Sequence, residues 1–194
     1  MTGMPAALDR SPADDIAEIL IDEAAIAAKV SELGALIARD YRGTDVVLVS
    51  ILKGALPFLA DLMRAIPIHV ALDFLEVSSY GESTESSGVV RILKDLARPI
   101  EGRHVLVVED ILDTGNTLHY VLAHLHGQRP ASVKLCALLD KPARRLVPID
   151  VDYRGFSIPD KFVVGYGLDY AERYRNLPFI GVLKPEVYSE ERAP

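Results

Sequence analysis

The stretch from residue 105 to residue 139 constrains the fold more than any other part of this 194-residue sequence. Two largely apolar runs, Val105–Val108 and Val133–Leu139, the second interrupted only by Lys134, have the length and composition of buried strands. The apolar residues between them recur at helical spacing, at Leu118, Val121, Leu122 and Leu125. Strand, helix and strand in this order predict a right-handed crossover and therefore a parallel sheet.

The flanking sequence predicts further strands and helices. A helix is expected to begin after Asp22, whose side chain can cap the first free amides. Its apolar face consists of Ile26, Val30, Leu33 and Ile37. The other expected elements are strands at 46–49, 68–77 and 89–93 and a helix carrying Leu56, Leu59 and Met63.

The chain is expected to form one domain over residues 1–194, because 49% hydrophobic residues suffice for one well-packed core. Residues 1–13 lack periodicity and are expected to form a loose tail. The polar segment 78–88 reads as a flexible connection. The expected fold class is α/β, a single domain with a central, mostly parallel twisted β-sheet flanked by helices.

Charge and composition exclude several function classes. The formal net charge of -7 argues against nucleic acid as a partner, since such binding depends on many Lys and Arg contacts to phosphate. The sequence has no run of 18 apolar residues, so no membrane span is expected. The single cysteine, Cys136, lies in an apolar run and is expected to serve packing. These features together predict a cytoplasmic protein.

A candidate site follows the strand at 105–108. Thr114-Gly115-Asn116-Thr117 offers small side chains, hydroxyls and free helix amides, which suit a phosphate group. Beside it, Glu109, Asp110 and Asp113 would repel each other and a phosphate. A hydroxyl-rich sugar and Mg²⁺ would resolve that conflict, because carboxylates bind both. The alternative is a solvated acidic turn with an ordinary helix cap at Asp113 or Thr114. Neither a Walker A motif nor a Gly-x-Gly-x-x-Gly fingerprint occurs.

These residues carry a resemblance to a known family. Residues 105–117, with the sequence VLVVEDILDTGNT, resemble the signature that binds 5-phosphoribosyl-1-pyrophosphate (PRPP) in type I phosphoribosyltransferases. More specifically, residues 16–184 resemble the hypoxanthine-guanine phosphoribosyltransferases. The further matching segments are 52–54, 79–81, 91–95, 138–141, 156–160 and 162–170.

The resemblance implies a fold, an activity and an assembly. The fold would be that of type I phosphoribosyltransferases, with a small hood from the N- and C-terminal segments, including about 160–184, and an active-site loop at 78–88. The activity would be Mg²⁺-dependent transfer of the phosphoribosyl group from PRPP to N9 of hypoxanthine or guanine, which yields IMP or GMP and pyrophosphate. The assembly would be a homodimer or homotetramer.

The resemblance also implies roles for residues around PRPP. Glu109 and Asp110 would hold the ribose hydroxyls and a Mg²⁺ ion, and Asp113 would be the general base for N7 of the purine. The 5′-phosphate would bind the segment that ends with Thr114, Gly115, Asn116 and Thr117. Lys53 and Gly54 would bind pyrophosphate, with the Leu52-Lys53 peptide typically cis in the family.

A second group of implied roles concerns the base and the lid. Lys141 would donate to O6 of the purine, Phe162 would stack on its ring, and the Val163 carbonyl would accept from N1 or the 2-amino group. Asp169 would carry a second Mg²⁺ contact through its side chain, and Arg175 would reach pyrophosphate. Ser79 and Tyr80 would belong to a lid that excludes water from the reacting centre.

Other interpretations of the same residues stay open at this point. Without the resemblance, Lys53 is a solvated lysine, Phe162 and Val163 are strand residues, and Asp169 and Arg175 are a surface pair. A xanthine-preferring enzyme would share the same motifs. A nucleotide-binding regulator on this fold would need a helix-turn-helix or a basic face, and a partner-binding module would not need the acids.

Overall fold

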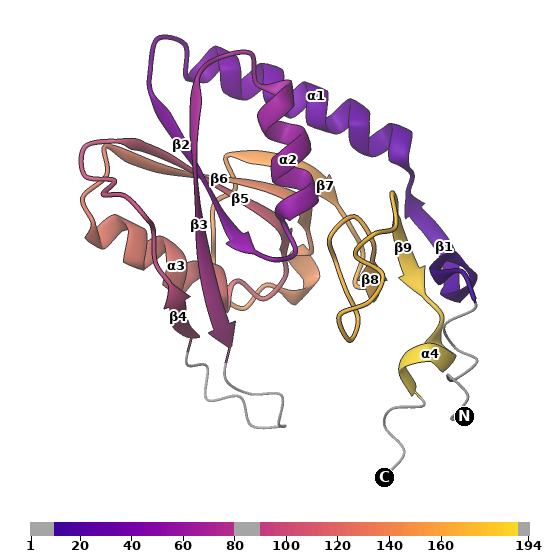
Figure 1. Ribbon diagram of the computed structural model, residues 1–194. Helices are drawn as coiled ribbons and strands as arrows, with labels where there is room; N and C mark the ends of the chain where they lie inside the picture. Colours follow the sequence, from indigo (N-terminus) through magenta and orange to yellow (C-terminus); the bar gives the residue numbers. More distant parts are fainter. Residues whose placement is uncertain (1–9, 80–89, 190–194) are drawn as a thin grey trace, which may run out of the picture.

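The computed structural model describes residues 10–79 and 90–189, and it consists of a helix-flanked sheet with a smaller sheet beside one end (Figure 1). The predicted lid residue Tyr80 and most of the loop 78–88 lie outside the described residues. No helix of the described residues is long and apolar enough to cross a membrane.

The helices and strands alternate along most of the chain. The strands are β1 (Ile16–Ile21), β2 (Val46–Leu52), β3 (Val70–Ser79), β4 (Val90–Lys94), β5 (His104–Leu112), β6 (Ser132–Asp140), β7 (Tyr153–Ser157), β8 (Val163–Val164) and β9 (Ile180–Leu183). The α-helices are α1 (Glu23–Asp40), α2 (Leu56–Ala65), α3 (Asn116–Gly127) and α4 (Pro185–Ser189). Two short 3₁₀ helices, Pro12–Asp15 and Pro142–Arg144, complete the described elements.

The main sheet has the order β4-β3-β2-β5-β6-β7. All of its pairings are parallel except that between β3 and β4. The unit β5-α3-β6 is the predicted crossover, and its two strands pair in register from His104 with Ser132 to Leu112 with Asp140. The expected α/β fold with a mostly parallel sheet is confirmed.

The two faces of this sheet bury different side chains because successive residues of a strand point to opposite sides. On one face, Leu106 and Val108 of β5 pack in the core formed with α1 and α2. On the other face, Val105 and Val107 pack against α3. Cys136 is fully buried in the first of these cores, and burial raises the pKa of its thiol, which agrees with the predicted packing role.

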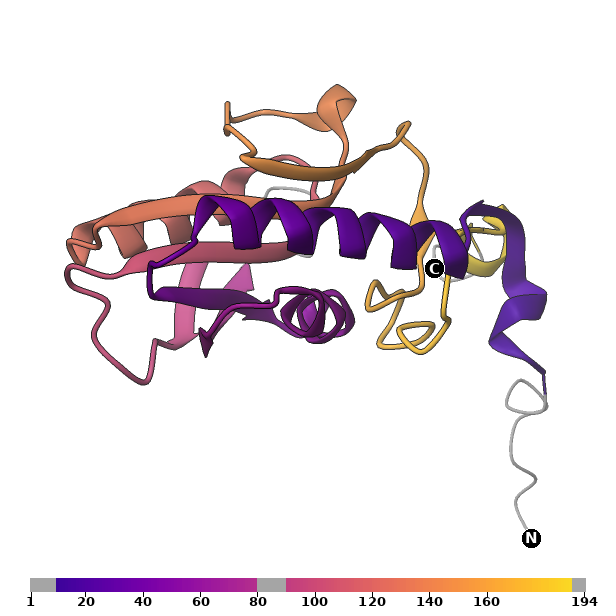
Figure 2. The same ribbon diagram turned by 90° about the horizontal axis from the view of Figure 1, so that it is seen from above.

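The hood is a second, three-stranded sheet in which β9 pairs with both β1 and β8. It therefore combines the N-terminal and C-terminal parts of the chain, and Figure 2 shows it beyond one end of α1. Antiparallel pairing sets Val163 opposite Val182 and Ile21 opposite Ile180. The chain leaves this sheet at Asp22, whose carboxylate caps α1 by accepting from the Ala25 amide at 2.7 Å.

Several predicted boundaries are wrong. The predicted strand 68–77 is found two residues later, as β3. The predicted strand 105–108 continues to Leu112, because β6 pairs with β5 along the acidic segment as well. Pro12 and Ala13, which were expected in a loose tail, begin a 3₁₀ helix that the Ser11 hydroxyl caps.

Candidate active site

The predicted site residues gather where β2, β5 and β6 end. These strands are parallel, so their carboxyl ends lie at one edge of the sheet, where ligands bind in open α/β folds. The turn after β2, the β5–α3 loop and the segment after β6 all start there. The hood loop at 165–175 reaches the same edge, since an added Cβ at Gly167 would lie 1.9 Å from the Gly54 carbonyl oxygen.

The two neighbouring acids Glu109 and Asp110 lie within β5 and face different surroundings. Glu109 lines a pocket of about 190 Å³ together with Asp113, Gly115 and other residues of the β5–α3 loop. Asp110 is 8% exposed and lies against the turn after β2, where a Cβ on Gly54 would lie 2.0 Å from its Oδ2. The acids therefore reach two parts of one site rather than a single point.

Burial makes both carboxyl groups hard to ionise. Desolvation raises the pKa of Glu109 well above its ordinary value, and the Asp110 charge raises it further. The Glu109 Oε2 oxygen is buried without a hydrogen-bond partner among the described residues. Desolvation also raises the pKa of Asp110 from 3.8 to about 6, although the backbone amides that donate to it and the Arg175 charge act in the opposite direction.

The loop after β5 presents helix amides to the same pocket. Gly115 has a φ of +90°, which glycine adopts without steric cost, and it precedes the first residue of α3, Asn116. Gly115 has no side chain with which to cap α3, and the Asn116 amide makes only a long contact of 3.5 Å with the Thr114 hydroxyl, so amides of the first turn stay available to an anion. The alternative interpretation places an ordinary helix cap at Asp113 or Thr114, but the residue at the cap position is Gly115. The loop thus keeps the features of the predicted phosphate site.

A segment that follows β6 braces this loop. The Thr114 carbonyl accepts from the amides of Leu146 and Val147 at 2.9 and 3.2 Å. The Arg145 side chain donates to the Asp113 carbonyl at 3.1 Å and also pairs with Asp140 at the end of β6. Sequence reasoning missed this brace. Nothing in the sequence of residues 140–145 distinguishes Arg145 from a solvated surface arginine.

The predicted general base, Asp113, has a cation beside it. Arg144 Nε lies 3.0 Å from Asp113 Oδ1, and the side chains are 48% and 38% exposed. Arg144 also lies 3.7 Å from Asp160. Asp113 is therefore a partly exposed carboxylate at the mouth of the pocket, with one charged partner.

The predicted pyrophosphate residues meet in a second cluster. The peptide between Leu52 and Lys53 is cis, as the resemblance implies. Lys53 Nζ lies 3.1 Å from a carboxylate oxygen of Glu172, and Arg175 Nη2 lies 3.2 Å from the other. Arg175 also pairs with Asp169 at 2.8 Å and donates to the Gly167 carbonyl at 2.8 Å. Sequence reasoning did not identify Glu172.

The predicted base-binding residues form a third group, next to the hood. Lys141 is 5% exposed, and its Nζ donates to the Lys161 carbonyl at 2.6 Å. Phe162 is 43% exposed and makes an edge contact with Tyr170, with ring centroids 5.7 Å apart. The neighbouring Val163 is buried in β8. The Lys141 amide donates to the Leu112 carbonyl, so this group adjoins the end of β5.

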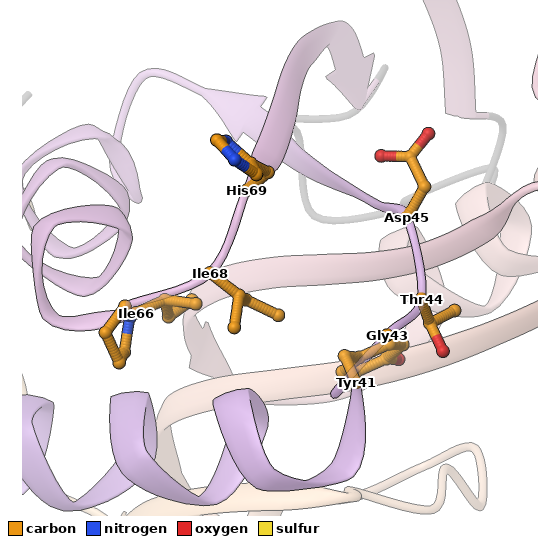
Figure 3. Close-up of a pocket in the computed structure, with 8 residues that line it drawn as sticks. Tyr41, Gly43, Thr44, Asp45, Ile66, Ile68 and His69 are labelled. Carbon is orange, nitrogen blue, oxygen red and sulfur yellow. The ribbon is translucent and has the colours of Figure 1, made fainter.

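A wider pocket of about 760 Å³ lies away from all these residues (Figure 3). Its lining comes from the end of α1 and from the segments that enter β2 and β3, and it includes Tyr41, Asp45 and His69. These segments precede the amino ends of the strands, whereas ligands of open α/β sheets bind at the carboxyl ends. We therefore take the smaller pocket, which Glu109 and the β5–α3 loop line, as the candidate site.

The described acids do not form a metal cage by themselves. Among residues 10–79 and 90–189, no group of three His, Cys, Asp or Glu side chains could hold a metal ion. Mg²⁺, however, usually takes one or two carboxylates and completes its shell with water and substrate phosphate oxygens. The unpartnered Glu109 oxygen fits a single carboxylate ligand to an ion that is shared with a substrate, and Asp110 can supply such a ligand at its own part of the site.

Comparison with known proteins agrees with this geometry. Residues 17–171 match the family model described as phosphoribosyl transferase domain. The chain is 53% identical over 174 residues to the hypoxanthine-guanine phosphoribosyltransferase of Bacillus subtilis, with 90% of this chain and 97% of that protein covered. It is also 53% identical to the bifunctional protein TilS/HprT of Listeria monocytogenes, of whose length it spans 27%.

A solved structure shares the whole architecture. The hypoxanthine phosphoribosyltransferase of Staphylococcus aureus matches with a TM-score of 0.88 and 48% sequence identity. The match covers 96% of this chain and 99% of that one, so it includes the hood as well as the main sheet.

Proposed function

Because the chain belongs to the phosphoribosyltransferase family, we propose that it transfers the 5-phosphoribosyl group of PRPP to N9 of hypoxanthine or guanine. The products are IMP or GMP and pyrophosphate, and the process is purine salvage. The observation that carries the proposal is the arrangement at the end of β5. There, the buried Asp110 and the half-buried Glu109, both desolvated, stand beside a helix N-terminus that Gly115 leaves without a side-chain cap.

The 5′-phosphate binds the loop from Asp113 to Thr117. The first-turn amides of α3 and the hydroxyls of Thr114 and Thr117 supply donors, and the pocket they line has room for one phosphate group. The brace from Arg145 holds the loop in place before the ligand arrives. Such preorganisation reduces the entropy that binding must remove.

The acids of β5 bind the ribose and would hold the metal ion. Glu109 and Asp110 accept from the 2′- and 3′-hydroxyls and hold Mg²⁺, with Asp169 as a further ligand. Mg²⁺ held by these residues would neutralise negative charge on the leaving pyrophosphate. Lys53 and Arg175 add positive charge at the same group from two different loops.

Asp113 receives the proton from N7 of the purine as N9 attacks the anomeric carbon of PRPP. Its carboxylate is partly exposed beside the pocket, so it is accessible to N7 of a bound purine. A positioned general base contributes about 10²–10⁴-fold to a rate. Arg144 lies beside this carboxylate, with its Nε 3.0 Å from Asp113 Oδ1.

The base is selected by the third group. Lys141 has donors only, so it matches the acceptor oxygen at C6 of hypoxanthine and guanine and opposes the amine of adenine. The Val163 carbonyl accepts from N1–H, which 6-oxopurines carry and adenine lacks. Phe162 is 43% exposed, and its ring is available for stacking on the purine.

An assay with PRPP, Mg²⁺ and one base at a time tests the proposal. Hypoxanthine and guanine should be converted, adenine should not, and xanthine measures the remaining breadth of the site. Absence of nucleotide formation from every base would refute the activity, and conversion of adenine would refute the assigned base recognition. Native mass measurement tests the homodimer or homotetramer that we also propose.

A further inference from the structure

Glu172 joins the two cations that the proposed function assigns to pyrophosphate. Its Oε2 accepts from Lys53 Nζ at 3.1 Å, and its Oε1 accepts from Arg175 Nη2 at 3.2 Å. Lys53 follows β2 and lies 119 residues away in sequence, so the carboxylate connects the main sheet with the hood loop. One side chain thus uses both of its oxygens on the two positive groups that would receive an anion.

The backbone presents Glu172 in a defined way. Ala171 and Glu172 have φ values of +50° and +60°, a conformation that side-chain-bearing residues adopt at a cost. The Glu172 amide donates to Asp169 Oδ2 at 3.0 Å. Arg175 in turn donates to the Gly167 carbonyl at 2.8 Å. The loop therefore fixes the position from which the Glu172 side chain reaches the two cations.

Stability does not account for this arrangement. The side chains of Lys53 and Glu172 are 65% and 67% exposed, and exposed ion pairs contribute little to folding. A carboxylate also has an unfavourable charge for a place that is to receive pyrophosphate. Its two oxygens nevertheless engage the same donors that phosphate oxygens would engage.

We propose that Glu172 is an internal competitor for pyrophosphate, which occupies Lys53 and Arg175 in the free protein and is displaced when PRPP binds. This inference rests on the proposed function, because it requires that the two cations bind the pyrophosphate group. Displacement weakens binding of the pyrophosphate group in PRPP and in the product alike. Glu172 therefore promotes release of pyrophosphate and gives up some affinity for PRPP.

The test compares Glu172→Gln with the wild type. The amide keeps the shape of the side chain and removes its charge. Titration calorimetry with Mg²⁺ and pyrophosphate should show about two- to tenfold tighter binding, the range that the loss of one exposed and one partly exposed ion pair implies. KM for PRPP should fall by a similar factor, while KM for hypoxanthine should not change.

Glu101→Gln is the matched control. It removes one carboxylate and one exposed ion pair, with Arg129 at 2.9 Å, just before β5 begins and so at the opposite end of the sheet. This variant should bind pyrophosphate as the wild type does. A general effect of net charge would instead tighten binding equally in both variants, and that result would overturn the inference.

The remaining outcomes are equally decisive. Unchanged or weaker pyrophosphate binding by Glu172→Gln would show that Glu172 positions the cations for the ligand, and it would overturn the competition. A change of KM for hypoxanthine in parallel with that for PRPP would indicate a structural disturbance, with the same consequence. If the wild type neither binds pyrophosphate nor forms nucleotide, the proposed function itself fails. The calorimetric titration and the activity assay of the wild type alone reveal that outcome.

Discussion

The buried acid Asp110 makes a prediction about stability that is independent of any assay of activity. Replacement by Asn keeps the size of the side chain and keeps an oxygen that can accept from the Ile111 amide, as Asp110 Oδ1 does at 2.8 Å. It removes the charge that burial disfavours. In metal-free buffer, Asp110→Asn should therefore be more stable than the wild type at neutral and alkaline pH.

The magnitude follows from the pKa. Burial raises the pKa of Asp110 from 3.8 to about 6, and a shift of roughly two units corresponds to about 3 kcal/mol. The folded protein binds this proton more tightly than the unfolded chain does. The favourable contribution is thus fully present below about pH 4 and is lost as the pH rises through about 6. The new amide group must also be accommodated against Gly54, so the net gain at about pH 8 should be about 1–3 kcal/mol.

Urea unfolding in chelator at about pH 4 and about pH 8 measures the effect. The difference in free energy of unfolding between Asp110→Asn and the wild type should be larger at the higher pH. Asp150→Asn, at an exposed acid, should shift stability by less than about 0.5 kcal/mol at both. Asp110→Asn should also lose activity, because the carboxylate charge that destabilises the fold serves to bind the ligand. A variant that is less stable at about pH 8, or a difference independent of pH, would refute the reasoning.

Three further predictions concern activity. Asp113→Asn should lower kcat by about 10²–10⁴-fold without unfolding the protein, and steady-state kinetics with a circular dichroism control would check this. Lys141→Gln should slow the reactions of hypoxanthine and guanine. It should therefore reduce the preference over adenine, a ratio of kcat/KM that can reach about 10⁴–10⁵, as parallel assays of the three bases would reveal. Gly167→Ala should raise KM for PRPP and lower the melting temperature, since its Cβ would lie 1.9 Å from the Gly54 carbonyl oxygen and its φ of +101° disfavours alanine.

The central part of the fold could be predicted because its signals are local and strong. The strands β2, β5 and β6 each contain a run of four or more apolar residues, and α1 combines an Asp22 cap with helical spacing. The hood strands escaped prediction for a physical reason. β8 has two residues and β9 has four, so neither shows a period, and both depend on pairing with distant chain. The edge strand β7 contains Arg154 and Gly155, which interrupt an apolar pattern.

The candidate site likewise has a part that the sequence predicts and a part that it does not. The Asp113–Thr117 loop could be predicted because strand, acids and helix start are adjacent in sequence. The contacts of Lys53 with Glu172 and of Arg145 with the Asp113 carbonyl could not, since they join residues 119 and 32 positions apart. A charged side chain carries no sequence pattern that distinguishes a solvated surface residue from a partner in a site. Only the fold brings these groups together.

The structure also separates acids that serve the fold from acids that serve a ligand. Asp140 is buried, and both of its oxygens are paired with arginines, with Arg154 at 2.9 Å and with Arg145. Such a group needs no further partner. The Oε2 oxygen of Glu109 is equally buried and has no hydrogen-bond partner among the described residues, while its neighbour Asp110 is also desolvated. Two adjacent desolvated carboxyls cost stability, and ribose hydroxyls or a cation would offset that cost. The conflict that the sequence displays at these two positions is therefore itself an argument for a bound substrate.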